Sequence, residues 1–286
     1  MNIKNVLVLY KKSSYSIYFR HPSSSFKKRG VAPLEIARFK KNHQKHSQSL
    51  HTVENVLKKT GLNYTKVSRG GKVDFNRFDL IISVGGDGTF MEAARGSTGQ
   101  IILGVNSDPL WSVGRFCSAT AGTFEAVLLK FLLGKGLVRT LQRLKLQVGE
   151  QDAHVLNDIL VCHHNPGAMS RYYLTVGKTK EEQKSSGIWI ATAAGSSGAI
   201  RSAGGRLLPV ESAKIQYKPR ELYSGGGDFY KLRGSVLLSK IKLQVTSLMR
   251  EGFVFVDGSH VCFPFDFGET ITVSRSSYPI KVVWPR

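Results

Sequence analysis

Acidic residues are scarce in this sequence. Its 286 residues contain 20 Asp and Glu against 41 Lys and Arg, which gives a net charge of +21. Such an excess favours anionic partners: nucleic acid, acidic lipid surfaces or small molecules rich in phosphate. An ordinary solvated basic surface has the same composition, so the charge alone leaves these interpretations open.

Long apolar runs and paired cysteines are also missing. No run of 18 or more apolar residues occurs, so no membrane span is expected. The cysteines Cys117, Cys162 and Cys262 are far apart and odd in number, and no Cys/His spacing is typical of zinc. This favours a reducing compartment over a disulfide framework. His163 and His164 are adjacent, and neighbours on a strand point to opposite faces, so we do not expect them to chelate one metal together.

The start of the chain contains no acid. The first 30 residues are basic and rich in serine, as transit peptides are. A buried-strand pattern nevertheless begins at once at Val6–Tyr10, which argues against a cleaved presequence. The polar stretch from Lys11 to Gly30 is predicted to be a mobile loop.

Strand and helix patterns alternate through the first part of the chain. Apolar strand patterns are found at Asn5–Tyr10, Asp79–Val84 and Ile101–Val105. Helical patterns are found at Pro33–Lys59, Thr89–Arg95 and Thr123–Leu133. This alternation predicts an α/β domain with a parallel sheet and helices on its faces.

After about Leu137 short strands prevail and few helical patterns remain. Strands are expected at Leu141–Val148, Ala153–Cys162, Tyr172–Val176, Ile188–Ala191, Lys240–Leu248, Gly252–Asp257 and Thr270–Ser274. We therefore divide the chain into an α/β domain of residues 1–118 and a β-rich, sandwich-like domain of residues 119–286. Whether the C-terminal tail returns to the first domain is left open. The glycine cluster at Gly225–Asp228 is interpreted as a surface loop.

A second glycine-rich stretch, GGDGT, stands between a predicted strand and a predicted helix, at Gly85–Thr89. Ligands collect at the carboxyl ends of parallel strands, where glycines let the backbone approach an anion and helix N–H groups donate to it. Neither GxxxxGK[ST] nor GxGxxG occurs, so this is no Walker A loop or Rossmann fingerprint. Because a carboxylate repels phosphate, Asp87 either accepts a proton from a hydroxyl, holds Mg²⁺, or caps a tight turn, and spacing alone does not decide.

The GGDGT stretch resembles the motif shared by NAD kinases, diacylglycerol kinases and sphingosine kinases. Further stretches resemble NAD kinases in particular, and the resemblance covers nearly the whole chain from Asp79 onward. These stretches are Gly85–Arg95, Gly104–Asn106, Leu156–Asp158 with Asp for the family's Glu, Gly187–Gly205, Asp257–Gly258, Phe267–Val273 and Val282–Pro285. Gly104–Cys117, Arg171–Tyr173 and Lys184–Gly187 look most like the mitochondrial-type branch, which some bacterial enzymes also resemble.

The resemblance implies an NAD kinase with the fold that this family shares with diacylglycerol kinases. Such an enzyme moves a phosphoryl group from ATP or polyphosphate to the adenosine-ribose 2′-hydroxyl of NAD(H), giving NADP(H). Asp87 would be the general base. Mg²⁺ or another divalent cation would bridge the donor's phosphates, with no side-chain cluster to hold it.

The resemblance also implies which residues bind the substrates. Asn157 would hold the adenine side of NAD, Asp158 would accept hydrogen bonds from ribose hydroxyls, and Thr192 would support the neighbouring loop. The full set implied to bind the substrates is Gly85, Gly86, Gly88, Thr89, Asn106, Asn157, Asp158, Lys184, Ser186, Thr192, Ser197, Gly198 and Ser202. Without the resemblance, Asn157-Asp158 is interpreted as an ordinary strand-entry turn and Gly195–Gly198 as a plain loop.

Several positions depart from the family pattern. Ser186 replaces an Asp, Ala193-Ala194 replaces Pro-Thr, Ala199 replaces an aromatic residue and Arg201 stands where an apolar residue is common. These changes leave base specificity and the choice between NAD and NADH open.

Two alternatives remain. A lipid kinase of the diacylglycerol or sphingosine type shares GGDGT, and Glu92 stands where those enzymes place a Glu. A basic nucleic-acid-binding protein on a degenerate kinase fold would fit the charge, but no RRM, KH or zinc-finger pattern occurs, so nucleic acid is not the expected partner. We expect a cytoplasmic enzyme of bacterial type rather than a mitochondrial matrix enzyme. As in the family, we expect a homo-oligomer, either a dimer or a tetramer.

Overall fold

The computed structural model describes residues 3–20, 30–225, 230–238 and 240–284. The chain forms two compact units: unit 1 contains the residues up to Arg139 and those from Ile280 onward, and unit 2 is Thr140–Pro279. The sequence pattern predicts a division after residue 118. The structure places it later, because β5 (Cys117–Thr120) pairs with the sheet of unit 1 and α3 (Phe124–Leu132) packs in the core of that unit.

Unit 1 is built on one sheet. Its strand order is β2-β1-β3-β4-β19-β6, with β5 beside β4. The strands are β1 (Asn5–Tyr10), β2 (Asn63–Ser68), β3 (Leu80–Gly85), β4 (Ile101–Asn106), β6 (Val138–Leu141) and β19 (Ile280–Val283). β1 pairs in parallel with β2 and β3, and β4 pairs in parallel with β3, β5 and β19. The closing strand of the chain thus belongs to the first sheet.

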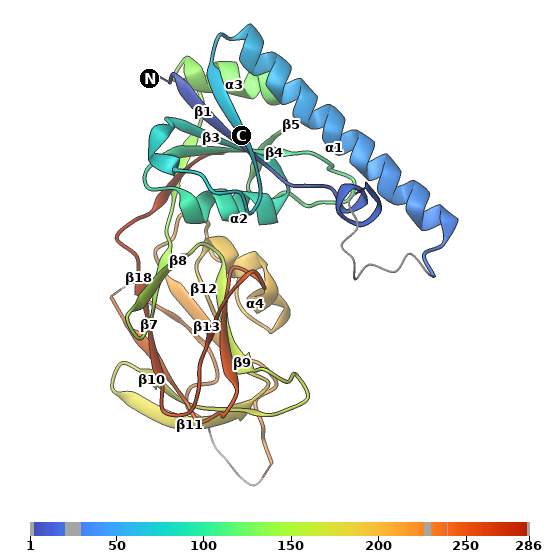
Figure 1. The fold of residues 1–286 in the computed structure, drawn as a ribbon. Coiled ribbons are helices and arrows are strands. Elements are labelled where there is room, and N and C mark those ends of the chain that lie inside the picture. Colours follow the sequence, from blue (N-terminus) through green and yellow to red (C-terminus); the bar gives the residue numbers. More distant parts are fainter. Residues whose placement is uncertain (1–2, 21–29, 226–229, 239, 285–286) are drawn as a thin grey trace. The chain divides into compact units, whose positions relative to one another are not determined.

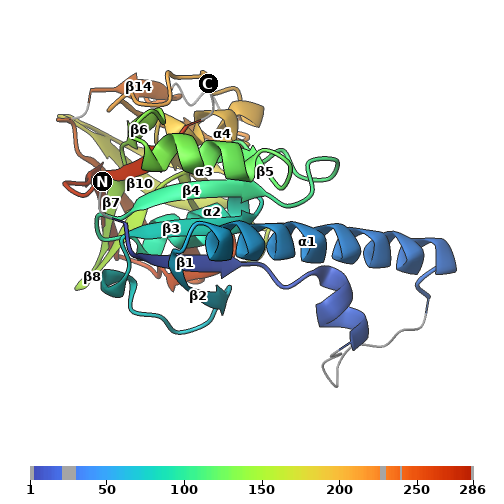
Figure 2. The same ribbon diagram turned by 90° about the horizontal axis from the view of Figure 1, so that it is seen from above.

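Helices cover both faces of this sheet. α1 (Pro33–Lys59) and α3 lie on one face, and α2 (Asp87–Gly96) lies on the other (Figures 1 and 2). Because both faces are covered, the middle strands are mostly apolar, and every residue of β3 is buried. α1 begins with Pro33 and ends just before Gly61, whose φ of +70° suits the residue after a helix. The predicted bounds of α1 match those in the structure.

The loop predicted for Lys11–Gly30 is only partly a loop. Ser16–Arg20 form a π-helical turn, η1. The hydroxyl of Ser13 accepts a hydrogen bond from the Ser16 N–H at 3.1 Å. Tyr15 stacks on Phe19 with 5.4 Å between the ring centroids. These local contacts stabilise a turn that the polar composition does not predict. The predicted loop between residues 21 and 29 lies outside the described residues.

Unit 2 consists of two six-stranded antiparallel sheets. The first has the order β11-β10-β15-β18-β7-β8 and the second the order β14-β13-β12-β9-β16-β17. Side chains of both sheets, such as Leu146 and Val245 of the first and Ile190 and Val254 of the second, belong to one buried cluster. The strands therefore form a sandwich. Together with the α/β unit, this confirms the predicted fold class.

The strands of unit 2 and its short helices are named here for reference. They are β7 (Leu144–Val148), β8 (Gln151–Val155), β9 (Asp158–His163), β10 (Ser170–Val176), β11 (Thr179–Ser185), β12 (Ile188–Ala191), η3 (Ala194–Ser197), α4 (Ala199–Ser202), β13 (Ile215–Pro219), β14 (Ser235–Leu237), β15 (Leu243–Ser247), β16 (Gly252–Val256), β17 (Val261–Pro264) and β18 (Thr270–Arg275).

Two strands predicted as single pieces are each divided. Residues 141–148 split because β6 belongs to the sheet of unit 1 and β7 to unit 2. Residues 153–162 split at Leu156-Asn157, which form a turn between β8 and β9. β2 and β11 were missed because their sequences, NYTKVS and TKEEQKS, are largely polar. Both are edge strands, where polar side chains are tolerated. The predicted surface loop at Gly225–Asp228 lies mostly outside the described residues.

Candidate active site

Asp87 is the first residue of α2, directly after the turn that leaves β3. Gly86 is the N-cap in an extended conformation with a φ of −126°, and no side chain caps this helix. The Asp87 carboxylate instead accepts a hydrogen bond at Oδ1 from the Phe116 N–H, at 3.0 Å. Of the three interpretations that the spacing left open, the capping role therefore does not describe this carboxylate, which is oriented by the loop before β5.

A thiol lies near this carboxylate. Burial, and secondarily the charge of Asp87, raise the pKa of Cys117 to about 12. The thiol is therefore protonated at neutral pH and is not a nucleophile.

The glycines before Asp87 allow the strand, the helix and a loop to meet closely. A Cβ at Gly85 would overlap the side chain of Thr89, and a Cβ at Gly86 would overlap the Ser112 hydroxyl. Gly88 has more room, with a guanidinium nitrogen of Arg69 3.4 Å from the position of a Cβ. The Thr89 side chain is 1% exposed and its N–H donates to the Gly86 carbonyl, so this residue braces the turn from inside. Its predicted contact with phosphate stays a prediction.

Asn106 ends β4 and organises the loop that follows. Its side-chain Nδ2 donates to the Ser112 carbonyl at 2.8 Å, and its Oδ1 accepts from the Asp108 N–H at 3.2 Å. Gly114, with a φ of +59°, packs so closely on Asn106 that a Cβ would overlap it. The Asn106 amide therefore shapes the loop that leads to Phe116, the residue that holds Asp87. Its predicted role in substrate binding stays a prediction.

In unit 2, Asn157 and Asp158 lie in the turn that begins β9, and Asp257 holds this turn. The Asp257 carboxylate accepts from the N–H of Leu156 at 3.1 Å and from the N–H of Asn157 at 2.6 Å. The Asp257 N–H donates to the Asp158 carbonyl at 2.9 Å. Burial, and then the charge of Asp257, raise the pKa of Asp158 to about 7. Asp158 is thus a carboxyl group that changes charge near neutral pH.

A loop after β12 braces the same turn. The Thr192 hydroxyl donates to the Leu156 carbonyl at 2.5 Å and accepts from the Gly195 N–H at 2.9 Å. A Cβ at Gly195 would overlap the backbone of Asn157, and one at Gly198 would lie 3.5 Å from a carboxylate oxygen of Asp158. The structure thus brings Thr192, Asn157, Asp158 and Gly198 together. Two further predicted residues follow in this loop and in α4: Ser197, which is half-buried, and Ser202, which is exposed.

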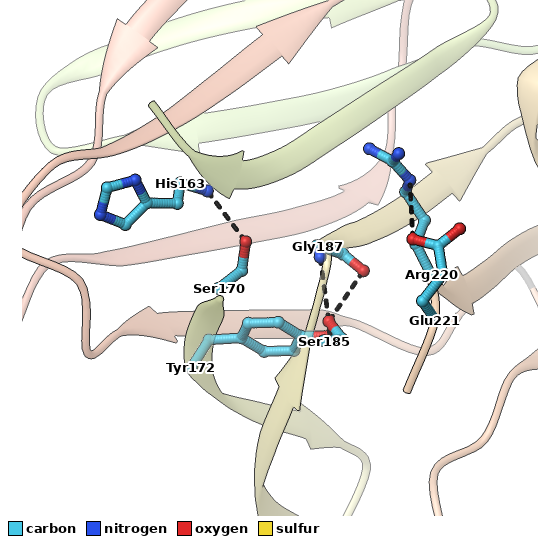
Figure 3. A network of polar contacts seen from close by, with 7 residues as sticks. All are labelled: His163, Ser170, Tyr172, Ser185, Gly187, Arg220 and Glu221. Atoms are coloured by element: carbon cyan, nitrogen blue, oxygen red, sulfur yellow. Dashed lines mark hydrogen bonds and ion pairs between the residues drawn. The ribbon is translucent and has the colours of Figure 1, made fainter. Parts of the chain in front are cut away.

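Lys184 and Ser186 flank a buried serine, Ser185, for which the sequence pattern predicts no role. Ser185 accepts from the Gly187 N–H at 3.0 Å and its hydroxyl lies 2.9 Å from the Tyr172 hydroxyl (Figure 3). The backbones of Lys184 and Ser186 bond to a neighbouring segment, and both side chains are half-buried. The only sequence signal for this bend was Gly187, whose φ is +111°.

Asp257 was also missed as a residue of the site. In the sequence it belongs to a stretch similar to the family's C-terminal segment, with no role of its own implied. Its own signal is weak: an Asp-Gly pair at the end of a strand is typical of any turn. Asp257 has a φ of +50°, and it acts on Asn157 across a separation of a hundred residues. Pattern reading along the chain does not detect such a pair.

The chain has many known relatives. It is 32% identical over 265 residues to the "Probable NADH kinase" of Oryza sativa subsp. japonica, which covers 84% of this chain and 82% of the rice protein. The chain belongs to the NAD kinase family. The family model described as "ATP-NAD kinase N-terminal domain" matches residues 28–128. The NAD kinase of Aquifex aeolicus is 28% identical over 262 residues, covering 85% of this chain and 91% of that protein.

Solved NAD kinase structures share the fold. An NAD kinase from Archaeoglobus fulgidus in complex with ATP superimposes with a TM-score of 0.73 at 22% identity, covering 98% of this chain and 93% of the other. Yeast NADH kinase complexed with NADH gives a TM-score of 0.71 at 16% identity, covering 100% and 84% of the two chains. At these identities the likeness shows the fold. The relatives named here support a kinase, and none of them is a lipid kinase or a nucleic-acid-binding protein.

None of the helices in the described part of the chain is both long and apolar enough to cross a membrane. The same residues hold no group of three or more His, Cys, Asp or Glu side chains placed to bind a metal ion.

Proposed function

We propose that this chain is an NAD(H) kinase that transfers the γ-phosphoryl group of ATP to the adenosine-ribose 2′-hydroxyl of NAD or NADH. The observation that carries the proposal is the Asp87 carboxylate, which stands in the family's GGDGT motif, at the first residue of a helix after a buried parallel strand. The Phe116 N–H fixes the orientation of this carboxylate through Oδ1. Ligands of α/β sheets bind at this end of the strands.

In this mechanism Asp87 accepts the proton of the 2′-hydroxyl as the hydroxyl oxygen attacks the γ-phosphorus. A new bond forms between that oxygen and phosphorus, and the bond from the γ-phosphorus to the bridging oxygen breaks. The bonding electrons leave with ADP. The products are NADP(H) and ADP, with one proton released to solvent from Asp87. Positioning and charge neutralisation supply most of the rate in such reactions.

The residues of unit 2 supply the proposed dinucleotide contacts. Asp158 in its ionised form accepts hydrogen bonds from ribose hydroxyls, and Asn157 binds the adenine side. Gly198, Ser197 and Ser202 line the adenine pocket, and Lys184 and Ser186 contact the rest of NAD. The support for these roles is the family match and the hydrogen bonds that join Thr192 and Asp257 to the Asn157–Asp158 turn.

Mg²⁺ would be held in this site mainly by the phosphate oxygens of the donor rather than by a set of protein side chains. The described residues offer no cluster of metal-binding side chains, and Mg²⁺ is commonly held by phosphate oxygens, water and at most one or two carboxylates. When bound, it neutralises charge on the phosphates. The cytoplasmic location and the homo-oligomeric state remain predictions.

The deciding experiment is NADP(H) formation by the purified chain. The protein is incubated with NAD or NADH, with ATP or polyphosphate, and with Mg²⁺ or a chelator. A coupled NADP-specific dehydrogenase detects NADP, and chromatography detects NADPH. We expect product with ATP and Mg²⁺ and none with the chelator. No product in any combination would reject the proposal, and diacylglycerol or sphingoid bases with labelled ATP would be tested next.

The choice of acceptor is part of the same experiment. The rice relative carries the name "Probable NADH kinase", the Arabidopsis relative the name "NADH kinase" and the Aquifex relative the name "NAD kinase". We therefore propose that both NAD and NADH are substrates, and the ratio of their kcat/KM values measures the preference.

A further inference from the structure

Two basic residues, Lys11 and Arg69, follow strands that precede α2 in the chain, and their charges act on each other. Lys11 follows β1, and its N–H donates to the Val84 carbonyl near the end of β3 at 3.3 Å. Arg69 follows β2, and its N–H donates to the Tyr10 carbonyl at 2.8 Å. Both residues therefore lie at the carboxyl ends of parallel strands: Lys11 after β1, which is next to the strand that carries GGDGT, and Arg69 after β2, on the far side of β1.

Glu92 of α2 holds Arg69 in place through two contacts. Its Oε2 accepts from the Arg69 Nε at 3.1 Å, and its Oε1 accepts from the Gly70 N–H at 2.7 Å. The Arg69 Nη1 then lies 3.4 Å from where a Cβ of Gly88 would be, and the side chain is 28% exposed. The guanidinium thus lies against the start of the helix that contains Asp87, with its Nε bound to Glu92.

This arrangement gathers positive charge in one place. The N-terminus of α2 carries the positive end of the helix dipole. Burial, and in smaller part the charge of Arg69, lower the pKa of Lys11, while the charge of Asp108 raises it. Asp108 is 4% exposed and also lies 3.9 Å from the Lys45 ammonium. Glu92 already accepts hydrogen bonds from Arg69 and Gly70. An anion placed beside the helix start would therefore reduce the repulsion between the positive charges of Lys11 and Arg69.

We propose that Arg69 and Lys11 bind the phosphate chain of the phosphoryl donor at the start of α2, and that Glu92 is the positioning residue that orients Arg69. The proposal rests on the proposed kinase function. It also assigns a role to Glu92 that needs no lipid substrate. A guanidinium binds phosphate oxygens in a fixed fork, so one held in place by a carboxylate loses little freedom when the donor arrives.

Binding of the donor without NAD tests this directly. Titration calorimetry would measure the affinities of Mg²⁺-ATP and inorganic tripolyphosphate, with adenosine as a probe that lacks phosphate. We expect Arg69→Met and Lys11→Met each to weaken both phosphate ligands by about tenfold or more. Adenosine binding should not change. Arg69→Lys should restore part of the ATP affinity, since it keeps the charge and loses the fork.

A matched control removes an equal charge elsewhere in unit 1. Lys59 forms a 2.7 Å ion pair with Glu125, and the Lys59 side chain is 72% exposed. Lys59→Met should leave the ATP affinity within about twofold of wild type, because exposed ion pairs contribute little. Thermal unfolding of each variant shows whether the fold is intact.

Kinetics separate a role in donor binding from a general structural role. Arg69→Met should raise the KM for ATP and leave the KM for NAD unchanged. Glu92→Gln should raise the KM for ATP in wild type and have no further effect in the Arg69→Met background. Unchanged ATP affinity in Arg69→Met, or parallel rises of both KM values, would overturn the proposal.

The two proposals fail in distinguishable ways. Wild type that binds ATP through Arg69 but forms no NADP(H) would reject the kinase function and keep the phosphate site. If the wild type forms NADP(H) and the Arg69→Met variant binds ATP as tightly as the wild type, the kinase function stands and this phosphate site is rejected. A loss of tripolyphosphate but not ATP affinity would also reject it, since the shared phosphate chain would not be the bound group.

Discussion

The backbone N–H of Asp257 donates to the carbonyl of Asp158, and the Asp257 carboxylate holds the two residues that precede Asp158. Two carboxyl groups are thereby brought near each other at one turn. Burial and the neighbouring charge raise the pKa of Asp158 to about 7. The proposed contact with ribose hydroxyls needs the ionised form, so this pair links NAD binding to pH.

The KM for NAD should fall as pH rises through neutrality. Asp158 is protonated below its pKa of about 7 and ionised above it. Between about pH 6 and about pH 8 the ionised fraction rises roughly tenfold, and the KM should fall by a similar factor. Steady-state kinetics at fixed ATP would measure this. Asp158→Asn should raise the KM and remove the pH dependence, and a pH-dependent KM in that variant would contradict the assignment.

Asp257→Asn should move that transition to lower pH. The substitution keeps the shape of the side chain but removes the negative charge that contributes to the raised pKa of Asp158. Its remaining side-chain oxygen can accept only part of the two bonds from Leu156 and Asn157, so some loss of NAD affinity is also expected. The pH profile of the KM for NAD distinguishes the two effects. If only the hydrogen bonds to Leu156 and Asn157 were weakened, the KM would rise but the midpoint of its pH dependence would not move. Asp152→Asn, an exposed carboxylate paired with Lys145, is the control.

Asp87→Asn should abolish most turnover while substrates still bind. The amide keeps the shape and can still accept from the Phe116 N–H, but it cannot take a proton from the 2′-hydroxyl. We expect kcat to fall by about 10²- to 10⁴-fold, with dissociation constants for NAD and ATP near the wild-type values. Coupled NADP formation gives the rate and calorimetry gives the binding. A rate within a few-fold of wild type would remove Asp87 from the mechanism.

Gly195→Ala should destabilise unit 2 and impair NAD binding. The added methyl would overlap the backbone of Asn157, which cannot move without disturbing the bonds to Asp257. The loss should be about 2 kcal/mol or more in the free energy of unfolding. Gly122→Ala is the comparison, because nothing lies within 4 Å of a Cβ there and its φ is not positive. Denaturant unfolding should show a change of less than about 0.5 kcal/mol for that variant.

Unit 1 should lose stability in acid through His46. Burial, followed by the charge of Lys11, lowers the pKa of His46 to about 4, and its Nδ1 is hydrogen-bonded to the Ser107 hydroxyl at 2.9 Å. The unfolded chain takes up this proton near the ordinary pKa of about 6.5, so stability falls as pH drops from there toward 4. Unfolding midpoints between pH 7 and about pH 4.5 would show it. His46→Gln should reduce the fall, whereas His51→Gln, at an exposed position on the same helix, should not.

Much of unit 1 could be predicted from the sequence, because its inner strands β1, β3 and β4 are largely buried and form apolar runs. The helix Pro33–Lys59 was also predicted with its correct bounds, since a proline and a glycine mark its ends. β11 could not be predicted from the sequence pattern, because it is an edge strand and its residues are almost all polar. The predicted division after residue 118 lies too early in the chain. β5 pairs with β4 in the sheet of unit 1, and the local sequence pattern does not indicate this pairing.

Motif order predicted roles for Asp87 in unit 1 and for Asn157 and Asp158 in unit 2, which no single pattern could suggest, and these roles stay predictions. The residues that orient them, Phe116 and Asp257, were not found. Phe116 acts through its backbone N–H, which carries no side-chain signature. Asp257 acts on a turn far away in the sequence. Such supporting contacts depend on the folded chain, and only the structure shows them.

The parallel pairing of β19 with β4 also has a consequence for synthesis on the ribosome. In the strand order β19 separates β4 from β6, so the sheet of unit 1 lacks an inner strand until nearly the whole chain has emerged. Unit 2, a continuous segment inserted between the two parts of unit 1, contains all of its own strands earlier. Although domains generally fold from the N-terminal end first, here unit 1, which contains the first residues, is completed after unit 2.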